Sequence, residues 1–180
     1  MEKKIAILRG INVGGKRKIL MNDLKALCEK LSFENPLTYI QSGNVIFEDS
    51  KNQSNRELGD KLAKGILEKF GFEVPVIVRT AKELSNSIAQ NSFYEEGRDI
   101  SQLHLTFLKE EPAKENQEIL LSYNYEPDEF VLQGQDVFIY CEGKYHKSKL
   151  SNNFFEKKLK VGATTRNWKT VLKLKELSQS

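Results

Sequence analysis

Residues 37–47, LTYIQSGNVIF, are two short apolar runs on either side of the polar tetrapeptide Gln41-Ser42-Gly43-Asn44. Both runs are rich in β-branched and aromatic residues, and a polar tetrapeptide containing glycine between two such runs is typical of a β-hairpin. The sequence therefore predicts two antiparallel strands at this point. What lies on each side of the hairpin then sets the fold.

One strand and one helix precede the hairpin, and one helix and one strand follow it. Residues 3–8 are strand-like and lead into a helical pattern that begins near Asn22. After the hairpin, the capping-box sequence 54–57 opens a helix that Gly71 ends, and a strand follows at 74–78. The order βαββαβ predicts a ferredoxin-like unit with sheet order 4-1-3-2 and two helices on one face.

A second α+β half begins near residue 80. Its expected elements are a strand at 103–107, a helix at 115–121, a hairpin within 130–140, a helix over about 153–160 and a last helix from Thr164-Thr165. The prediction is an α+β chain of two parts. Residues 1–80 form the ferredoxin-like subdomain, which packs on a smaller subdomain of residues 81–180 with two basic C-terminal helices.

The composition of the chain limits where the protein is expected to occur and which classes of protein it fits. The 180 residues suit one domain or two joined subdomains, and no run approaches the ~18 apolar residues of a membrane span. The N-terminal residues lack a signal-peptide pattern, and the two cysteines give neither a disulfide framework nor a metal motif. We therefore expect a cytoplasmic protein with no membrane partner, no metal and no cofactor, and the oligomeric state stays open.

Positive charge is concentrated near the C-terminus. Residues 144–175 contain ten Lys or Arg and one acid, Glu156, whereas the whole chain has a net charge of only +3. Such a segment is either a solvated helical face or a surface that faces an anion. Aromatic residues lie among the cations, which is compatible with nucleic-acid binding, although aromatic residues in a C-terminal segment more often belong to a core.

The connection after the first strand carries the clearest binding signal. Residues 9–16, RGINVGGK, combine three glycines with two cations between a strand and a helix. Glycine lets backbone N–H groups approach a ligand, and the cations favour an anion. Gly10, Gly15 and Lys16 also have the spacing of a P-loop, but Arg17 replaces the hydroxyl residue that would hold magnesium, so we expect metal-free anion binding in loop 9–17.

Ferredoxin-like topology brings this loop to a second polar segment. The first strand pairs antiparallel with the third, so the end of the first strand lies beside the start of the third. We therefore expect Arg9, Gly10 and Asn12 to lie next to hairpin residues 41–44. In this interpretation Arg9 and Lys16 neutralise charge, Gly14 and Gly15 offer N–H groups, and Asn44 orients the ligand; alternatively, residues 41–44 only make a turn.

A third polar cluster lies in the second half. It comprises Ser148-Lys149 and Thr164-Thr165-Arg166-Asn167. If Thr164 or Thr165 caps the last helix, Arg166, Lys169 and Lys173 share one helical face, and the helix N-terminus with Arg166 is an anion site. Capping alone is the structural alternative.

Three of these segments resemble the signatures of a known family. Residues 9–16, Tyr39 to Val45 and Ala163 to Trp168 are similar to the motifs of bacterial domain-of-unknown-function family 1697, over essentially the whole chain. The resemblance implies two α+β subdomains, the first ferredoxin-like, and implies no established activity. It also implies that the following positions matter, without a catalytic role for any: Arg9, Gly10, Asn12, Gly14, Gly15, Lys16, Gln41, Ser42, Gly43, Asn44, Ser148, Lys149, Arg166 and Asn167.

Three functions remain in competition. The first is a protein that binds a phosphate-bearing ligand, either a nucleotide or nucleic acid, through loop 9–17, hairpin 41–44 and segment 144–175. The second is an enzyme acting on a small phosphorylated metabolite, with His146 or Lys149 as acid–base group. In the third, the motifs are purely structural and join the two halves. A closed pocket favours the enzyme, an open basic surface favours nucleic acid, and polar groups paired with one another favour the structural role.

Overall fold

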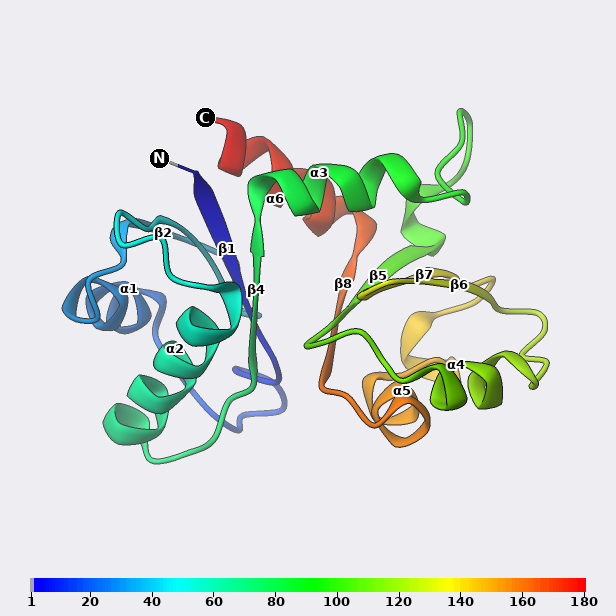
Figure 1. Ribbon diagram of the computed structural model, residues 1–180, viewed down its shortest axis with the longest axis horizontal. Helices are drawn as coiled ribbons and strands as arrows, with labels where there is room; N and C mark the ends of the chain where they lie inside the picture. Colours follow the sequence, from blue (N-terminus) through cyan, green and yellow to red (C-terminus); the bar gives the residue numbers. More distant parts are fainter. Residues whose placement is uncertain (1) are drawn as a thin grey trace. The chain divides into compact units, whose positions relative to one another are not determined.

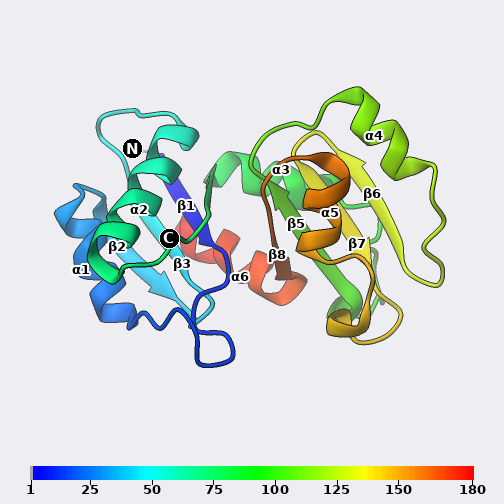
Figure 2. The ribbon, with the colours of Figure 1, turned by 90° about the horizontal axis from the view of Figure 1, so that it is seen from below.

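The computed structural model describes residues 2–180 and divides the chain into two compact units. Unit 1 holds the residues up to 85 together with 174–180, and unit 2 holds residues 86–173. The fold is α+β, as predicted, with two four-stranded antiparallel sheets. Figures 1 and 2 show the elements of each unit.

Unit 1 has the predicted ferredoxin-like topology. Its elements in chain order are β1 (Lys3–Leu8), α1 (Met21–Lys30), β2 (Glu34–Tyr39), β3 (Asn44–Glu48), α2 (Asn55–Phe70) and β4 (Val76–Thr80). The sheet order is β2-β3-β1-β4 with every pair antiparallel, which confirms the predicted order 4-1-3-2. Helices α1 and α2 cover one face of this sheet (Figure 2).

The core of unit 1 follows from the alternation of side chains along β1. Ala6 and Leu8 point toward the helices and join a cluster with Leu24 of α1 and Leu62 of α2. Ser54 and Glu57 form the predicted capping box of α2, and Gly71 ends the helix with φ +78°. Local signals and the apolar pattern thus agree in this half of the chain.

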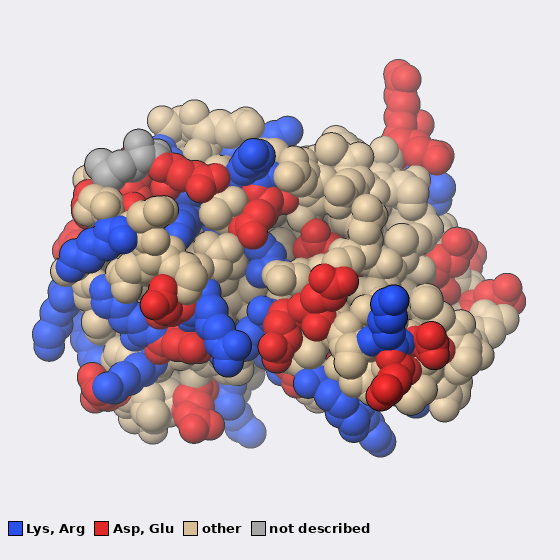
Figure 3. All heavy atoms as spheres, viewed as in Figure 1, with Lys and Arg blue, Asp and Glu red and all other residues tan. Residues whose placement is uncertain are grey.

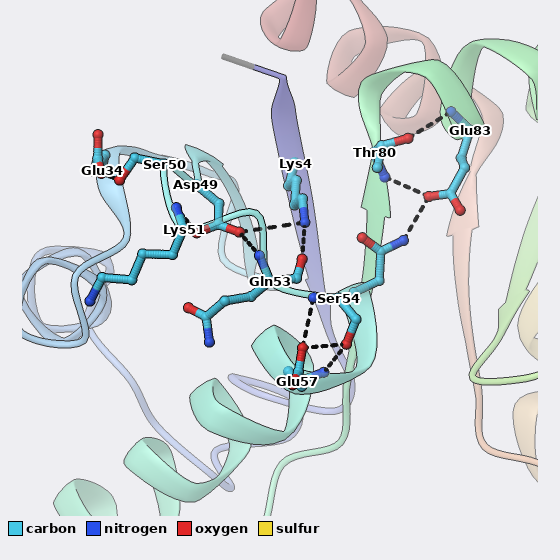
Figure 4. A network of polar contacts seen from close by, with 11 residues as sticks. Lys4, Glu34, Asp49, Ser50, Lys51, Gln53, Ser54, Glu57, Thr80 and Glu83 are labelled. Carbon is cyan, nitrogen blue, oxygen red and sulfur yellow. Dashed lines mark hydrogen bonds and ion pairs between the residues drawn. The ribbon is translucent and has the colours of Figure 1, made fainter.

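A polar network joins the ends of several elements of unit 1 (Figure 4). The buried ammonium of Lys4 on β1 donates to the carbonyl of Gln53 and lies 3.6 Å from Asp49, which in turn accepts from the Gln53 N–H. At the start of α3 (Ala81–Gln90), Thr80 and Glu83 form a second capping box. A buried lysine is tolerated here because its charge has both a carboxylate and a carbonyl as partners.

Unit 2 repeats the topology of unit 1. Its elements are β5 (Leu103–Leu108), α4 (Lys114–Leu121), β6 (Glu129–Gln133), β7 (Asp136–Tyr140), α5 (Asn152–Leu159) and β8 (Ala163–Asn167), with short 3-10 turns η1 (Ile100–Gln102) and η2 (Tyr145–Lys147). The sheet order β6-β7-β5-β8 matches β2-β3-β1-β4 position by position. The second half is therefore ferredoxin-like too, which is more than the α+β subdomain that the sequence predicts.

The last helix begins later than expected. Residues 163–167 are strand β8, which pairs antiparallel with β5, and α6 (Trp168–Gln179) starts only after it. The prediction that Thr164 or Thr165 caps the last helix is therefore wrong. The cap is Asn167, whose Oδ1 accepts from the Thr170 N–H at 2.8 Å. The Thr165 hydroxyl does not cap a helix but hydrogen-bonds the Thr106 hydroxyl of the neighbouring strand at 2.7 Å.

Candidate functional site

Loop 9–18 forms a small exposed hairpin. Val13 and Lys16 make an antiparallel bridge, the Asn12 N–H donates to the Arg17 carbonyl at 3.1 Å, and the Lys16 N–H donates to Val13 at 3.0 Å. Gly14 and Gly15 form the tip with φ of +57° and +74°, the handedness that a two-residue hairpin turn requires. Figure 2 shows this segment as the dark blue loop that projects from unit 1. For convenience we call residues 12–18 the basic hairpin.

The geometry of the basic hairpin differs from that of a P-loop. A P-loop leads directly into a helix whose N-terminus points at the phosphates. Here α1 begins only at Met21, five residues after Lys16, and the glycines turn a hairpin. The rejection of a P-loop on sequence grounds agrees with this geometry.

Three consecutive cations define the charge of the basic hairpin. Lys16, Arg17 and Lys18 are all exposed. The Arg17 guanidinium lies near Gly10, where an added Cβ would be 3.3 Å from its Nη1. Arg9 is half-buried, and its N–H donates to the Pro75 carbonyl at the start of β4.

Asn12 fastens the basic hairpin to its surroundings. Its side-chain amide donates to the carbonyls of Ile19 at 3.0 Å and Gln41 at 2.8 Å, and its Oδ1 accepts from the Ile19 N–H at 2.9 Å. Because the bond to Gln41 crosses to the β2–β3 turn, the predicted convergence of loop 9–17 and hairpin 41–44 is confirmed. Within unit 1, Asn12 therefore serves as a structural clamp.

The β2–β3 turn fits tightly against the end of β1. The Leu8 N–H donates to the Gly43 carbonyl at 2.9 Å. A Cβ on Gly43 would lie 2.6 Å from Cδ1 of Ile11, so this position has room only for glycine. Asn44 is fully buried and donates to the Tyr39 carbonyl at 3.0 Å and to Ser42 Oγ at 3.4 Å. The tightly packed residues of the β2–β3 turn thus form the base that supports the basic hairpin.

A cavity of about 290 Å³ opens where these two loops meet. It is lined by Asn12, Gly15, Lys18, Ile19, Leu20 and Gln41. The sequence interpretation named three of these six and missed Lys18, Ile19 and Leu20. Lys18 had a signal, since it is the third cation in a row, but Leu20 reads as the start of a helix and is in fact 71% exposed. The cavity combines a cation, two side-chain amides and apolar walls.

The predicted residues of unit 2 fall into two places. Ser148 follows η2, and its hydroxyl donates to Asp128 Oδ2 at 2.5 Å and accepts from the Leu150 N–H at 3.1 Å. Lys149 and His146 are both exposed. Ser148 therefore holds the loop before β6, while Lys149 and His146 face solvent.

Arg166 is in a different environment from the one predicted. It lies on β8 and is 8% exposed, so the prediction that it shares a helical face with Lys169 and Lys173 is wrong. Its Nη1 donates to the Thr165 carbonyl at 3.1 Å and to Thr164 Oγ1 at 3.4 Å. Burial lowers the pKa of Arg166 to about 10, and the guanidinium stays protonated at neutral pH.

The repeated topology pairs Arg166 with a residue that sequence reasoning missed. Arg79, on β4, pairs with Ile5 of the neighbouring strand β1. Arg166, on β8, pairs in the same way with Leu105 of β5. Arg79 is also buried, and it also donates to the carbonyl of the preceding residue, Val78, at 3.2 Å. In each unit the next residue caps a helix. The signal is the short similarity between RTAKEL at 79–84 and RNWKTV at 166–171.

Among residues 2–180, no three His, Cys, Asp or Glu side chains are grouped so that they could hold a metal ion. The helices of the same residues include none that is long and apolar enough to cross a bilayer.

Comparisons with known proteins add family and fold. The family model described as protein of unknown function (DUF1697) matches residues 1–138. The chain is similar to the solved structure of conserved bacterial protein SP0830 from Streptococcus pneumoniae, with a TM-score of 0.76 and 23% identity over 98% of each chain. No curated protein matches the sequence.

Proposed function

Because the chain belongs to the DUF1697 family of proteins of unknown function, we propose, from its own geometry, that it binds a phosphate-bearing polyanion through the basic hairpin. The carrying observation is the exposure of Lys16, Arg17 and Lys18, which directly follow the two-residue turn of a projecting hairpin. Nucleic acid is the polyanion that this arrangement fits best. An open set of cations neutralises several phosphates along a strand, whereas a single nucleotide is normally enclosed.

The residues divide between contact and positioning in this proposal. The three cations contact phosphates, and the cavity beside Lys18 and Leu20 accepts a base or sugar against its apolar wall. Asn12 and Asn44 have their amide groups engaged within unit 1, so we assign them the task of holding the hairpin in place. Gly14 and Gly15 allow the turn, and nothing lies within 4 Å of an added Cβ at either.

The experiment is a salt titration of binding to a fluorescently labelled single-stranded oligonucleotide, followed by anisotropy from ~50 to ~200 mM salt. Replacement of Lys16, Arg17 and Lys18 by glutamine should weaken binding at every salt concentration. It should also flatten the slope of log K against log salt by roughly one for each phosphate that the variant no longer neutralises. The matched control removes an equal charge from helices of the same unit through Lys25→Gln, Lys30→Gln and Lys64→Gln, all at exposed positions.

Two outcomes would count against the proposal. Equal effects of the hairpin and control variants would mean that only net charge matters. Absence of binding at the lowest salt would reject nucleic acid, and a parallel calorimetric titration with nucleoside triphosphates, with and without magnesium, would then test a small phosphorylated ligand. Magnesium-independent binding that the hairpin variant loses would identify that ligand class instead.

A further inference from the structure

Unit 2 contains a second cavity, and none of the predicted site residues is among those that line it. It has a volume of about 330 Å³ and is lined by residues 121 and 123–130 other than Pro127. Three aromatic rings, Tyr123, Tyr125 and Phe130, form part of the lining, and Glu126, Asp128 and Glu129 supply carboxylates. We propose that this cavity binds an organic ammonium group, carried either by a lysine side chain of a partner protein or by a free primary amine.

The aromatic part of the wall is the first argument. The Tyr125 ring is central, since its centroid lies 6.0 Å from that of Tyr123, 5.5 Å from Phe130 and 5.0 Å from Phe154. The faces of aromatic rings attract cations, and clusters of such rings bind alkylammonium groups. An anion would be repelled both by the ring faces and by the three carboxylates.

The molecule itself places an ammonium group over one of the rings of this wall, although the lysine is not among the residues that line the cavity. Nζ of Lys158, on α5, lies 4.2 Å from the centroid of the Tyr123 ring. This distance is well within the ~6 Å over which a cation and a ring attract each other. Tyr123 is nevertheless 52% exposed, so Lys158 leaves much of its surface open to solvent. Lys158 is therefore an internal competitor for the ligand proposed here.

One of the three carboxylates of the cavity is fixed in position. Asp128 accepts from the Ser148 hydroxyl at 2.5 Å and from the Glu142 N–H at 3.1 Å, and its own N–H donates to the Tyr125 carbonyl at 3.1 Å. Glu126 and Glu129 are exposed. A rigid loop that holds one acid and presents two others provides acceptors for the N–H groups of an ammonium without a large ordering cost.

The local charge supports the same ligand. Residues 110–129 contain seven acids and one lysine. Figure 3 shows Asp and Glu side chains gathered over the part of unit 2 where α4 lies. Such a surface attracts cations before contact.

The test is isothermal titration calorimetry of the full-length protein with two probes at constant ionic strength. One probe is n-butylammonium chloride and the other is an N-acetylated pentalysine peptide, with sodium chloride as the blank. Tyr123→Ala and Glu126→Gln should each weaken binding about fivefold or more, the size expected when one cation contact is removed. Glu118→Gln, an exposed acid of α4 outside the lining, is the matched control and should have little effect.

Lys158→Gln separates this proposal from simple charge attraction. It frees the Tyr123 ring, so binding of butylammonium should tighten beyond the small effect of removing one positive charge, for which Lys157→Gln on the same helix is the control. Amide shifts in a nitrogen-15 spectrum should be confined to residues around 121–130. Much tighter binding of the peptide would point to a partner protein, and equal affinity per ammonium group would point to a free amine.

The proposal would be overturned by any of three results. In the first, neither probe binds at tens of millimolar concentration. In the second, both probes bind, but Tyr123→Ala and Glu126→Gln change the affinity no more than Glu118→Gln does. In the third, the amide shifts caused by the probes lie outside residues 121–130. Circular dichroism of each variant checks that unit 2 stays folded, which we expect because Tyr123 and Glu126 are exposed.

Discussion

At the scale of single residues, the side chains of the candidate site divide between those that hold the structure and those that face solvent. Asn12 and Asn44 look like ligand-binding residues in the sequence because amides next to glycine turns often are. Their actual partners are carbonyls of unit 1. No sequence rule distinguishes the two cases, because only the folded chain brings these carbonyls, which are 5 to 29 residues away, next to the amides.

Replacement of Asn12 should therefore destabilise the protein. Asn12→Ala removes three hydrogen bonds and leaves partly buried backbone groups of Ile19 without a partner, so the free energy of unfolding should fall by about 2 kcal/mol. Urea denaturation measures the change. Gln41→Ala is the control, since Asn12 bonds only the main-chain carbonyl of Gln41. An equal loss in both variants would contradict the clamp.

His104 should make stability depend on pH. Burial lowers its pKa, a hydrogen bond with the Gln102 backbone opposes the shift, and its Nδ1 has no partner among the described residues. Since the unfolded histidine has a pKa of about 6.5, the unfolded state binds more protons below that value. The contribution of His104 is thus complete above pH ~6.5 and is lost as pH falls toward the folded-state pKa.

The measurement is denaturant unfolding between pH 5 and 8 for the wild type and for His104→Phe. Phenylalanine keeps a flat ring against Tyr145, with which His104 stacks at 4.4 Å, but it cannot ionise. The decline of stability on acidification should be shallower in His104→Phe, and His146→Gln, at an exposed position, should leave the wild-type slope. An unchanged slope in His104→Phe would refute the assignment.

At the scale of elements, most of the fold can be predicted from the sequence because local and tertiary signals agree. The capping box at Ser54, the stop at Gly71 and the two hairpins all lie where the patterns indicate. Strand β8 is the exception. Its sequence ATTRN has no apolar alternation, and its threonines imitate a helix cap. It is a strand because β5 supplies hydrogen-bond partners for its backbone, and because Thr106 and Asn152 hydrogen-bond the Thr165 hydroxyl. These contacts come from the tertiary structure and cannot be seen in the local sequence.

The start of α6 after Asn167 has a measurable consequence. Asn167→Ala should lower the free energy of unfolding by about 1 kcal/mol, because the Thr170 N–H loses its side-chain acceptor. Lys169→Ala, at an exposed position in the first turn, should change stability little. Thermal unfolding of the two variants decides the matter. A neutral Asn167→Ala would mean that the helix is capped by another residue.

At the scale of the whole molecule, the two sheets share one strand order, and this predicts a common pattern of backbone protection. β1 and β5 are central, each paired on both sides, whereas β2 and β6 lie at sheet edges. Amide hydrogen exchange followed by NMR should show stronger protection in β1 than in β2 and in β5 than in β6. The reason is that a local opening of the sheet exposes the amides of an edge strand at a lower free-energy cost than those of a central strand. Faster exchange in β5 than in β6 would contradict the equivalence of the two sheets.

The repeat escaped detection in the sequence for a related reason. Topology is specified by which faces are apolar and where the chain turns, and many sequences satisfy the same pattern. The β1–α1 connection spans residues 9–20, whereas its counterpart between β5 and α4 spans only 109–113. The most conspicuous motif of unit 1 therefore has no counterpart in unit 2, and the shared corner at Arg79 and Arg166 is too short to stand out.

Because the two units share one topology, the longer connection of unit 1 could be grafted into the corresponding position of unit 2. The residue after each first strand is anchored in the same way, with the Arg9 N–H on the Pro75 carbonyl and the Lys109 N–H on the Gly162 carbonyl. Residues 9–20 could thus replace 109–113 between strand and helix ends that already suit them, at a loop-closure cost of only about 0.8 kcal/mol. A chain engineered in this way would carry the basic hairpin twice. If the hairpin is the binding element, the graft would turn a monovalent binder of nucleic acid into a bivalent one.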